Sequence, residues 1–112
     1  MTEQYIRIDK YGDKFVYKNK AMTVLHNLDG PAVERAEGTK EWFVNGKRHR
    51  SDGPAVERAD GTKEWFVNGK LHRSDGPAVE FPEGTKLWYV DGKRHRSDGP
   101  AIECQWSQIL VC

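Results

Sequence analysis

The stretch HRSDGPAVERADGTKEWFVNGK, residues 49–70, decides the fold because the chain repeats it with few changes. A histidine marks the start of each copy, and these residues are 23 positions apart, at His26, His49, His72 and His95. Units 26–48 and 49–71 differ at only four positions. Periods of 20–50 residues are typical of solenoids, propellers and arrays. We therefore expect one short structural unit copied in tandem.

Each unit holds two short segments of β-forming residues separated by turn signals. The first reads PAVERA or PAVEFP (31–36, 54–59 and 77–82), and the second reads KEWFVN or KLWYVD (40–45, 63–68 and 86–91). Asn-Gly and Asp-Gly favour hairpins, since both central residues of a type I′ turn need positive φ. Asp-Gly-Pro is expected to be a turn that starts the next strand, because proline is confined to strand starts and edges. The sequence predicts an all-β fold of tandem β-hairpins, two strands per repeat, forming an elongated antiparallel sheet.

The domain organisation follows the repeat. Residues 1–25 contain QYIRID and KFVYKN and are predicted to form an atypical N-terminal cap hairpin. Residues 26–94 hold three 23-residue repeats. Residues 95–112 keep the first strand but lose the NGK turn, so they are predicted to be a partial capping repeat, as the end of an array requires. The alternative for this apolar end is an edge for dimerisation or partner docking.

Composition excludes several classes of protein. The net charge of +1 gives no general attraction to nucleic acid or an anionic membrane. No apolar run approaches the ~20 residues of a membrane span, and the polar N-terminus is no signal peptide. Cys104 and Cys112 lie outside the repeat and make no disulfide framework, with a terminal disulfide as the less favoured alternative. We expect a cytoplasmic protein, in a bacterial host cell if a phage encodes it.

Strand alternation sorts the aromatic residues onto two faces. One face is expected to carry a ladder of tryptophans repeated about 10 Å apart: Trp42, Trp65 and Trp88. Its simplest role is the structural core, and the alternative is a platform on which bases or sugars stack. The other face is expected to carry aromatic residues that need a partner or a second copy, so a homodimer is the default: Phe43, Phe66 and Tyr89, with Trp106 near the end.

The repeat resembles a known family. A 23-residue period carrying NGKRH or NGKLH after an aromatic residue resembles MORN repeats, most closely the divergent variety of phages, giant viruses and bacteria. The resemblance covers residues 26–104, and 11–20 weakly; Glu41, Glu64 and Leu87 stand near the usual strand glycine. It implies an elongated antiparallel sheet that serves as a scaffold or interaction surface.

Catalysis, metals and cofactors are not expected. His-x-x-Asp recurs in each unit, but copies about 10 Å apart cannot pool the ligands that zinc needs within ~2.0–2.2 Å. Ser51, Ser74 and Ser97 lie near these residues, yet they are tandem turn residues rather than one constellation in a pocket. We predict no catalytic residue, no metal site and no cofactor.

A basic edge is the strongest signal for binding. Corresponding turns place eight cations along one predicted edge: Lys47, Arg48, Arg50, Lys70, Arg73, Lys93, Arg94 and Arg96. This basic rim either solubilises the sheet or docks an acidic partner. We predict a non-enzymatic scaffold that binds a protein through its sheet face or rim, for instance a phage inhibitor of the anti-CRISPR kind. The alternative is an adaptor for anionic lipid or nucleic-acid phosphates. Reversing the charge of Arg50, Arg73 and Arg96 is expected to abolish binding without unfolding the protein.

Overall fold

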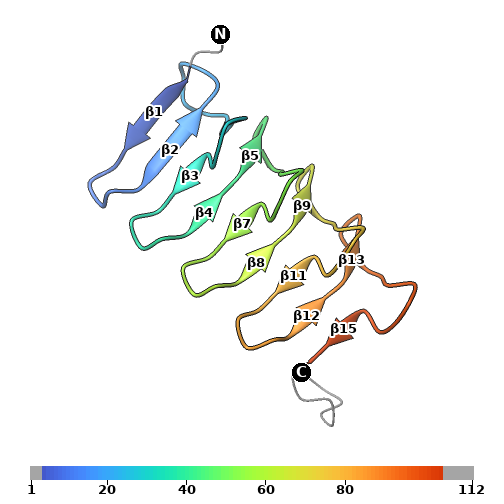
Figure 1. Ribbon diagram of the computed structural model, residues 1–112. Helices are drawn as coiled ribbons and strands as arrows, with labels where there is room; N and C mark the ends of the chain where they lie inside the picture. Colours follow the sequence, from blue (N-terminus) through green and yellow to red (C-terminus); the bar gives the residue numbers. More distant parts are fainter. Residues whose placement is uncertain (1–3, 105–112) are drawn as a thin grey trace.

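The computed structural model describes residues 4–104, which form 15 strands and no helix. Nine strands make one antiparallel sheet in the order β1-β2-β3-β4-β7-β8-β11-β12-β15. Figure 1 shows them side by side from the blue N-terminal hairpin to the red β15. Their bounds are β1 Tyr5–Ile8, β2 Lys14–Tyr17, β3 Val33–Glu34, β4 Lys40–Glu41, β7 Val56–Glu57, β8 Lys63–Glu64, β11 Val79–Glu80, β12 Lys86–Leu87 and β15 Ile102–Glu103. The all-β hairpin array predicted from the repeat is confirmed.

Each full repeat has four short strands, so the prediction of two strands per repeat is wrong. The extra strands form two-stranded hairpins along one long side of the sheet (Figure 1): β5 Phe43–Val44 with β6 Lys47–Arg48, β9 Phe66–Val67 with β10 Lys70–Leu71, and β13 Tyr89–Val90 with β14 Lys93–Arg94. The second β segment of each repeat, for example residues 40–45, changes its hydrogen-bonding strand at the tryptophan. The N–H of Trp42 donates to the carbonyl of Ala55 in the main sheet (2.7 Å), whereas its carbonyl accepts from the N–H of His49 (3.1 Å).

Two kinds of turn connect the strands. Asn45 and Gly46 both have positive φ (52° and 81°), as the predicted type I′ turn requires. The Asp60–Gly61 turn differs, because only Gly61 has positive φ (99°). It is a three-residue loop that ends in a glycine bulge. The N–H of Arg58 closes the loop by donating a hydrogen bond to the carbonyl of Thr62 (2.9 Å).

Small side chains fill the interior of the array. The fully buried residues come mainly from the Pro-Ala-Val segments: Ala32, Val33, Ala55, Val56, Ala78 and Val79. Cross-strand register then divides the sheet into two rows, one on each face. The valine row is Phe15, Val33, Glu41, Val56, Glu64, Val79, Leu87 and Ile102. The Lys–Glu row is Lys14, Glu34, Lys40, Glu57, Lys63, Glu80, Lys86 and Glu103.

Side chains hold neighbouring turns in place. The backbone N–H of Asn68 donates to Nδ1 of His49 (3.1 Å), so that nitrogen carries no proton. At the other end of the strands, the buried Thr39 hydroxyl accepts from the N–H of Ala59 in the next unit (3.2 Å). His26, His49 and His72 therefore hold the Asn-Gly and Asp-Gly turns by accepting a backbone hydrogen bond.

Candidate interaction surfaces

Three arginines of the predicted basic rim are built into the array. Arg50 lies over the ring of Trp42 with its Cζ 3.9 Å from the ring centroid. Its Nε donates to Asp52 (3.0 Å), and its Nη1 donates to the carbonyl of Pro54 and to Glu57, each at 3.0 Å. The same set of contacts recurs one and two repeats later: Arg73 with Trp65, Asp75, Pro77 and Glu80, and Arg96 with Trp88, Asp98, Pro100 and Glu103.

Glycine closes the other side of each guanidinium. A Cβ at Gly53 would lie 3.0 Å from Cζ of Arg50, closer than carbon atoms approach without contact strain. The φ of Gly53 lies outside the left-handed region, so close approach explains this glycine. Each arginine therefore lies between a tryptophan ring of one unit and the backbone of the next. We call this three-layer contact the arginine latch.

The latch gives Arg50, Arg73 and Arg96 a structural role, whereas the sequence predicted that they form a binding row. Each is paired with two carboxylates, and their side chains are only 23%, 23% and 18% exposed. The hydrogen bonds that Arg96 donates to Glu103 and Asp98 raise its pKa above its ordinary value, with the bond to Glu103 as the larger cause. The charge of a guanidinium held in this way is already paired with carboxylates, and few of its N–H donors are left to bind a partner. Charge reversal at these positions is now expected to destabilise the fold.

The remaining rim residues divide into paired and unpaired cations. Arg48 donates two hydrogen bonds to Glu41 (3.2 and 2.9 Å). Within residues 4–104, four exposed rim cations have no ion pair: Lys47, Lys70, Lys93 and Arg94. The basic rim is thus half of what the sequence predicted.

The tryptophan ladder, which the sequence predicted to be the structural core, lies beside the most buried residues, with Trp42 packed against the cluster of Ala55, Val56 and Phe66. Trp42, Trp65 and Trp88 are half-buried, and an arginine covers one face of each ring. The most buried apolar residues are mainly the alanines and valines of the Pro-Ala-Val segments. The covered rings also weaken the alternative of an open stacking platform.

The predicted aromatic face is only partly available. Phe66 is 9% exposed and belongs to the core cluster with Ala55 and Val56, so it cannot dock a partner. Phe43 and Tyr89 are half-buried. Trp106 lies outside the described residues.

Three open hollows lie along the array between successive loops at residues 27–30, 49–53, 72–76 and 95–98, of which the last three carry the sequence His-Arg-Ser-Asp. Their volumes are about 530, 670 and 570 Å³, and the central one is lined by Trp65, Val67 and two such loops. Latch arginines balance the aspartates in the second and third hollows, so these two favour neither anions nor cations, whereas the first contains Asp29 and Asp52 with Arg50 alone. Within residues 4–104, no group of three or more His, Cys, Asp or Glu side chains could hold a metal ion.

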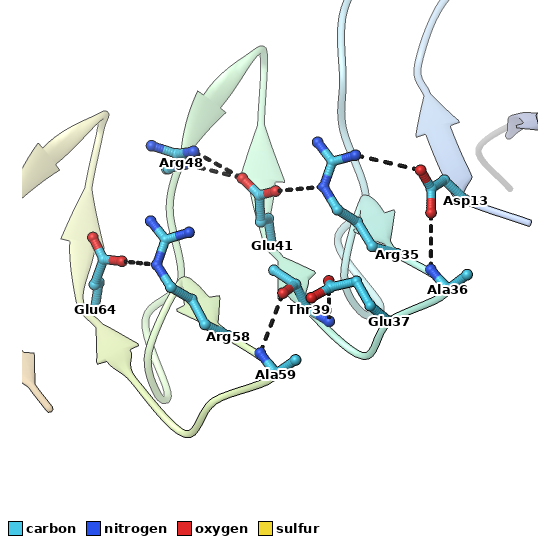
Figure 2. Close-up of polar contacts among 10 residues, drawn as sticks. All are labelled: Asp13, Arg35, Ala36, Glu37, Thr39, Glu41, Arg48, Arg58, Ala59 and Glu64. Atoms are coloured by element: carbon cyan, nitrogen blue, oxygen red, sulfur yellow. Dashed lines mark hydrogen bonds and ion pairs between the residues drawn. The ribbon is translucent and has the colours of Figure 1, made fainter. Parts of the chain in front are cut away.

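The valine row carries a network of ion pairs at its N-terminal end (Figure 2). Buried Glu41 accepts from Arg48 and lies 3.7 Å from Nε of Arg35. Nη1 of the same arginine lies 3.5 Å from Asp13. One repeat later, Nε of Arg58 donates to Glu64 (2.7 Å). Charge therefore covers the valines in the first two units.

The third unit replaces this ion pair with apolar residues. Phe81 stands at the position of Arg58, and Leu87 stands at the position of Glu64. Leu87 pairs with Ile102 across the strands, and Phe81 is 37% exposed. We call these three residues the apolar patch. We did not predict this patch from the sequence, although the joint change of Arg58 to Phe81 and of Glu64 to Leu87 between the second and third units was a signal that could have found it.

The comparisons with known proteins give no relative. No protein-family model, curated protein or solved structure matches the chain. The resemblance to MORN repeats therefore stays a prediction. Residues 4–104 include no helix long and apolar enough to cross a membrane. Cys104 is disulfide-bonded, against our expectation, and Cys112 lies outside the described residues.

Proposed function

We propose that the protein is a non-enzymatic repeat scaffold that binds a protein partner through the valine-row face, with the apolar patch as the centre of contact. The observation that carries this proposal is the joint replacement of the Arg58–Glu64 pair by Phe81 and Leu87. A sheet that needed only solubility would keep the ion pair in every unit. An apolar centre with a charged surround is the usual anatomy of a protein interface.

The charges around the patch suit this role. Arg94 is exposed and has no ion pair in residues 4–104, because Leu87 replaces the glutamate that its counterpart Arg48 contacts in the first unit. An unpaired arginine beside an exposed phenylalanine supports an anchor for a partner with an apolar side chain and a nearby carboxylate. Pro82 limits the backbone freedom of the same turn.

We extend the proposal to the inhibition of a host defence complex by a phage protein, of the anti-CRISPR kind, in the bacterial cytoplasm. The support is the resemblance to repeats carried by phages, together with a repeated geometry that serves surface rather than chemistry. Such a protein would act by covering a functional surface of its target.

The test restores the ion pair in the third unit. The variant Phe81→Arg with Leu87→Glu copies the second unit, so the fold has a precedent within the chain. We expect an unchanged melting temperature and loss of a stoichiometric, nuclease-resistant complex captured from bacterial lysate. A matched control, Lys47→Glu with Lys70→Glu, changes exposed rim charges and should keep the complex. Retention of the complex by the restored-pair variant would show that the patch is not the docking site.

A second candidate is binding of phosphates through Lys47, Lys70, Lys93 and Arg94, which are exposed and unpaired in the described chain. Four phosphate contacts would make affinity fall steeply with salt, with a log–log slope of about −3 to −4. Capture that disappears in the rim variant and at high salt, but survives restoration of the ion pair, would favour this candidate.

A further inference from the structure

The Lys–Glu row alternates in sign across eight neighbouring strands of the sheet. It begins with Lys14 in β2 and ends with Glu103 in β15, and no two neighbours carry the same charge. The row lies on the face opposite the apolar patch, because adjacent residues of a strand point to opposite faces. A proposal about this row is therefore independent of the proposed function.

Within residues 4–104, three of the four lysines of this row have no ion pair. Within the row, the only ion pair among residues 4–104 is Lys14 with Glu34, at 4.0 Å. Lys40, Lys63 and Lys86 are exposed and have no polar side-chain partner in the same range. The glutamates are partly engaged: Glu57 and Glu80 each accept from a latch arginine through Oε2, and they remain 39% and 33% exposed.

We propose that this face binds a second copy of the chain about a two-fold axis that runs parallel to the strands between β7 and β8. Such an axis reverses the order of the row in the second copy. Because the row begins with lysine and ends with glutamate, reversal places opposite charges against each other at all eight positions. The contacts join Lys63 to Glu57, Lys40 to Glu80, Lys86 to Glu34 and Lys14 to Glu103 of the second copy.

Charge complementarity also selects this orientation over the other two-fold arrangement. An axis along the row would place Lys40 against Lys40 and Glu57 against Glu57, with like charges at every position. Like charges brought together across an interface are strongly unfavourable. The self-complementary face thus fits a closed, isologous dimer.

The size of the contact predicts a weak dimer. The row spans about 34 Å at ~4.8 Å per strand, and two residues on either side along each strand give a strip about 14 Å wide. The two copies together would bury about 1,000 Å², at the lower end for specific interfaces. Exposed ion pairs are screened by salt, so we expect a dissociation constant in the micromolar range or weaker, and dissociation as salt rises.

The experiment combines sedimentation with cross-linking of the full chain. Sedimentation velocity at low salt should show a dimer that dissociates at high salt. Carbodiimide joins lysine to carboxylate without a spacer, and it is applied to an equal mixture of ¹⁵N-labelled and unlabelled protein. We expect mixed-isotope peptides that join Lys40 to Glu80. Within one chain these residues lie on β4 and β11, three strand spacings or about 14 Å apart, so this link reports contact between copies.

Two triple variants with the same change of charge separate this face from the hairpin tips. Lys40→Glu, Lys63→Glu and Lys86→Glu should raise the dissociation constant at least 100-fold. Lys47→Glu, Lys70→Glu and Lys93→Glu should leave it within about threefold. All six lysines are exposed, so melting temperatures should confirm that both variants fold. A monomer at low salt, equal weakening by both variants, or absence of the Lys40–Glu80 link would overturn the proposal.

Discussion

Replacement of Arg73 by alanine tests whether the arginine latch joins neighbouring repeats. The change removes a side chain that lies over Trp65 at 3.9 Å and donates to Asp75, Glu80 and the carbonyl of Pro77. Stability in a repeat array is the sum of unit terms and nearest-neighbour interface terms. The central latch is part of one such interface, and its loss should lower the free energy of unfolding of the whole array.

The magnitude follows from the exposure of each partner. Asp75 is 84% exposed, so its ion pair with Arg73 contributes only a few tenths of a kcal/mol. The bonds to Glu80 and to the carbonyl of Pro77 contribute about 1 kcal/mol each. The contact with the Trp65 ring contributes about 1 kcal/mol. We expect Arg73→Ala to cost about 3 kcal/mol in urea unfolding and to lower the melting temperature by roughly 10–20 °C.

A second substitution at the same latch provides the refutation. Gly76→Ala would place a Cβ 3.0 Å from Cζ of Arg73, and the guanidinium cannot retreat because the Trp65 ring lies behind it. In the parent protein this change should cost about 1 kcal/mol. In the Arg73→Ala background it should be neutral or stabilise by about 0.4–1 kcal/mol, since alanine restricts the unfolded chain. Equal costs in both backgrounds would refute the three-layer latch, because residues in contact must show coupling.

Three further predictions concern the turns. Gly69→Ala should destabilise by about 1–2 kcal/mol in urea unfolding, because φ at this residue is +83° and a Cβ is disfavoured there; the same stability as the parent would contradict the type I′ turn. His49→Phe should remove the acceptor for the Asn68 amide, which should then exchange its proton faster by NMR, with the Asn45 amide on His26 as the internal control. Hydrogen bonds from Thr39 hold the pKa of Glu37 below its ordinary value, so the Glu37–Thr39 contact should persist as pH falls through the ordinary glutamate range and be lost only below it, as an NMR titration of the Thr39 amide would show. A midpoint within or above the ordinary range would contradict the contact.

The fold could be predicted because turn chemistry and periodicity are local. Asn45–Gly46 needs positive φ at both residues, and the structure has it. The strand count could not be predicted, because the break at Trp42 depends on which neighbour its N–H and carbonyl find in three dimensions. Alternation alone continues a strand through that position.

The binding surface could be predicted only in part, because sequence places a charge on an edge but does not show what neutralises it. Arg50 and Lys47 look equivalent in the repeated Gly-Lys-Arg-His-Arg motif. In the structure Arg50 has two carboxylates, a carbonyl and a ring, and Lys47 has no ion pair among the described residues. The difference comes from partners on other strands, mainly Glu57. The spacing of residues along the chain does not predict these contacts.

A tandem repeat also tells where partner specificity can lie. Residues that the units after the first share, such as Arg73 and Gly76, are explained by contacts between units, so their recurrence carries no information about a partner. Departures from the repeat carry that information when they are coupled and leave apolar surface exposed. Phe81 and Leu87 meet both conditions, since they jointly replace an ion pair and one of them is 37% exposed. The Lys–Glu row meets neither, because it is repeated in every unit, and a surface that is the same in every unit is suited to another copy of itself.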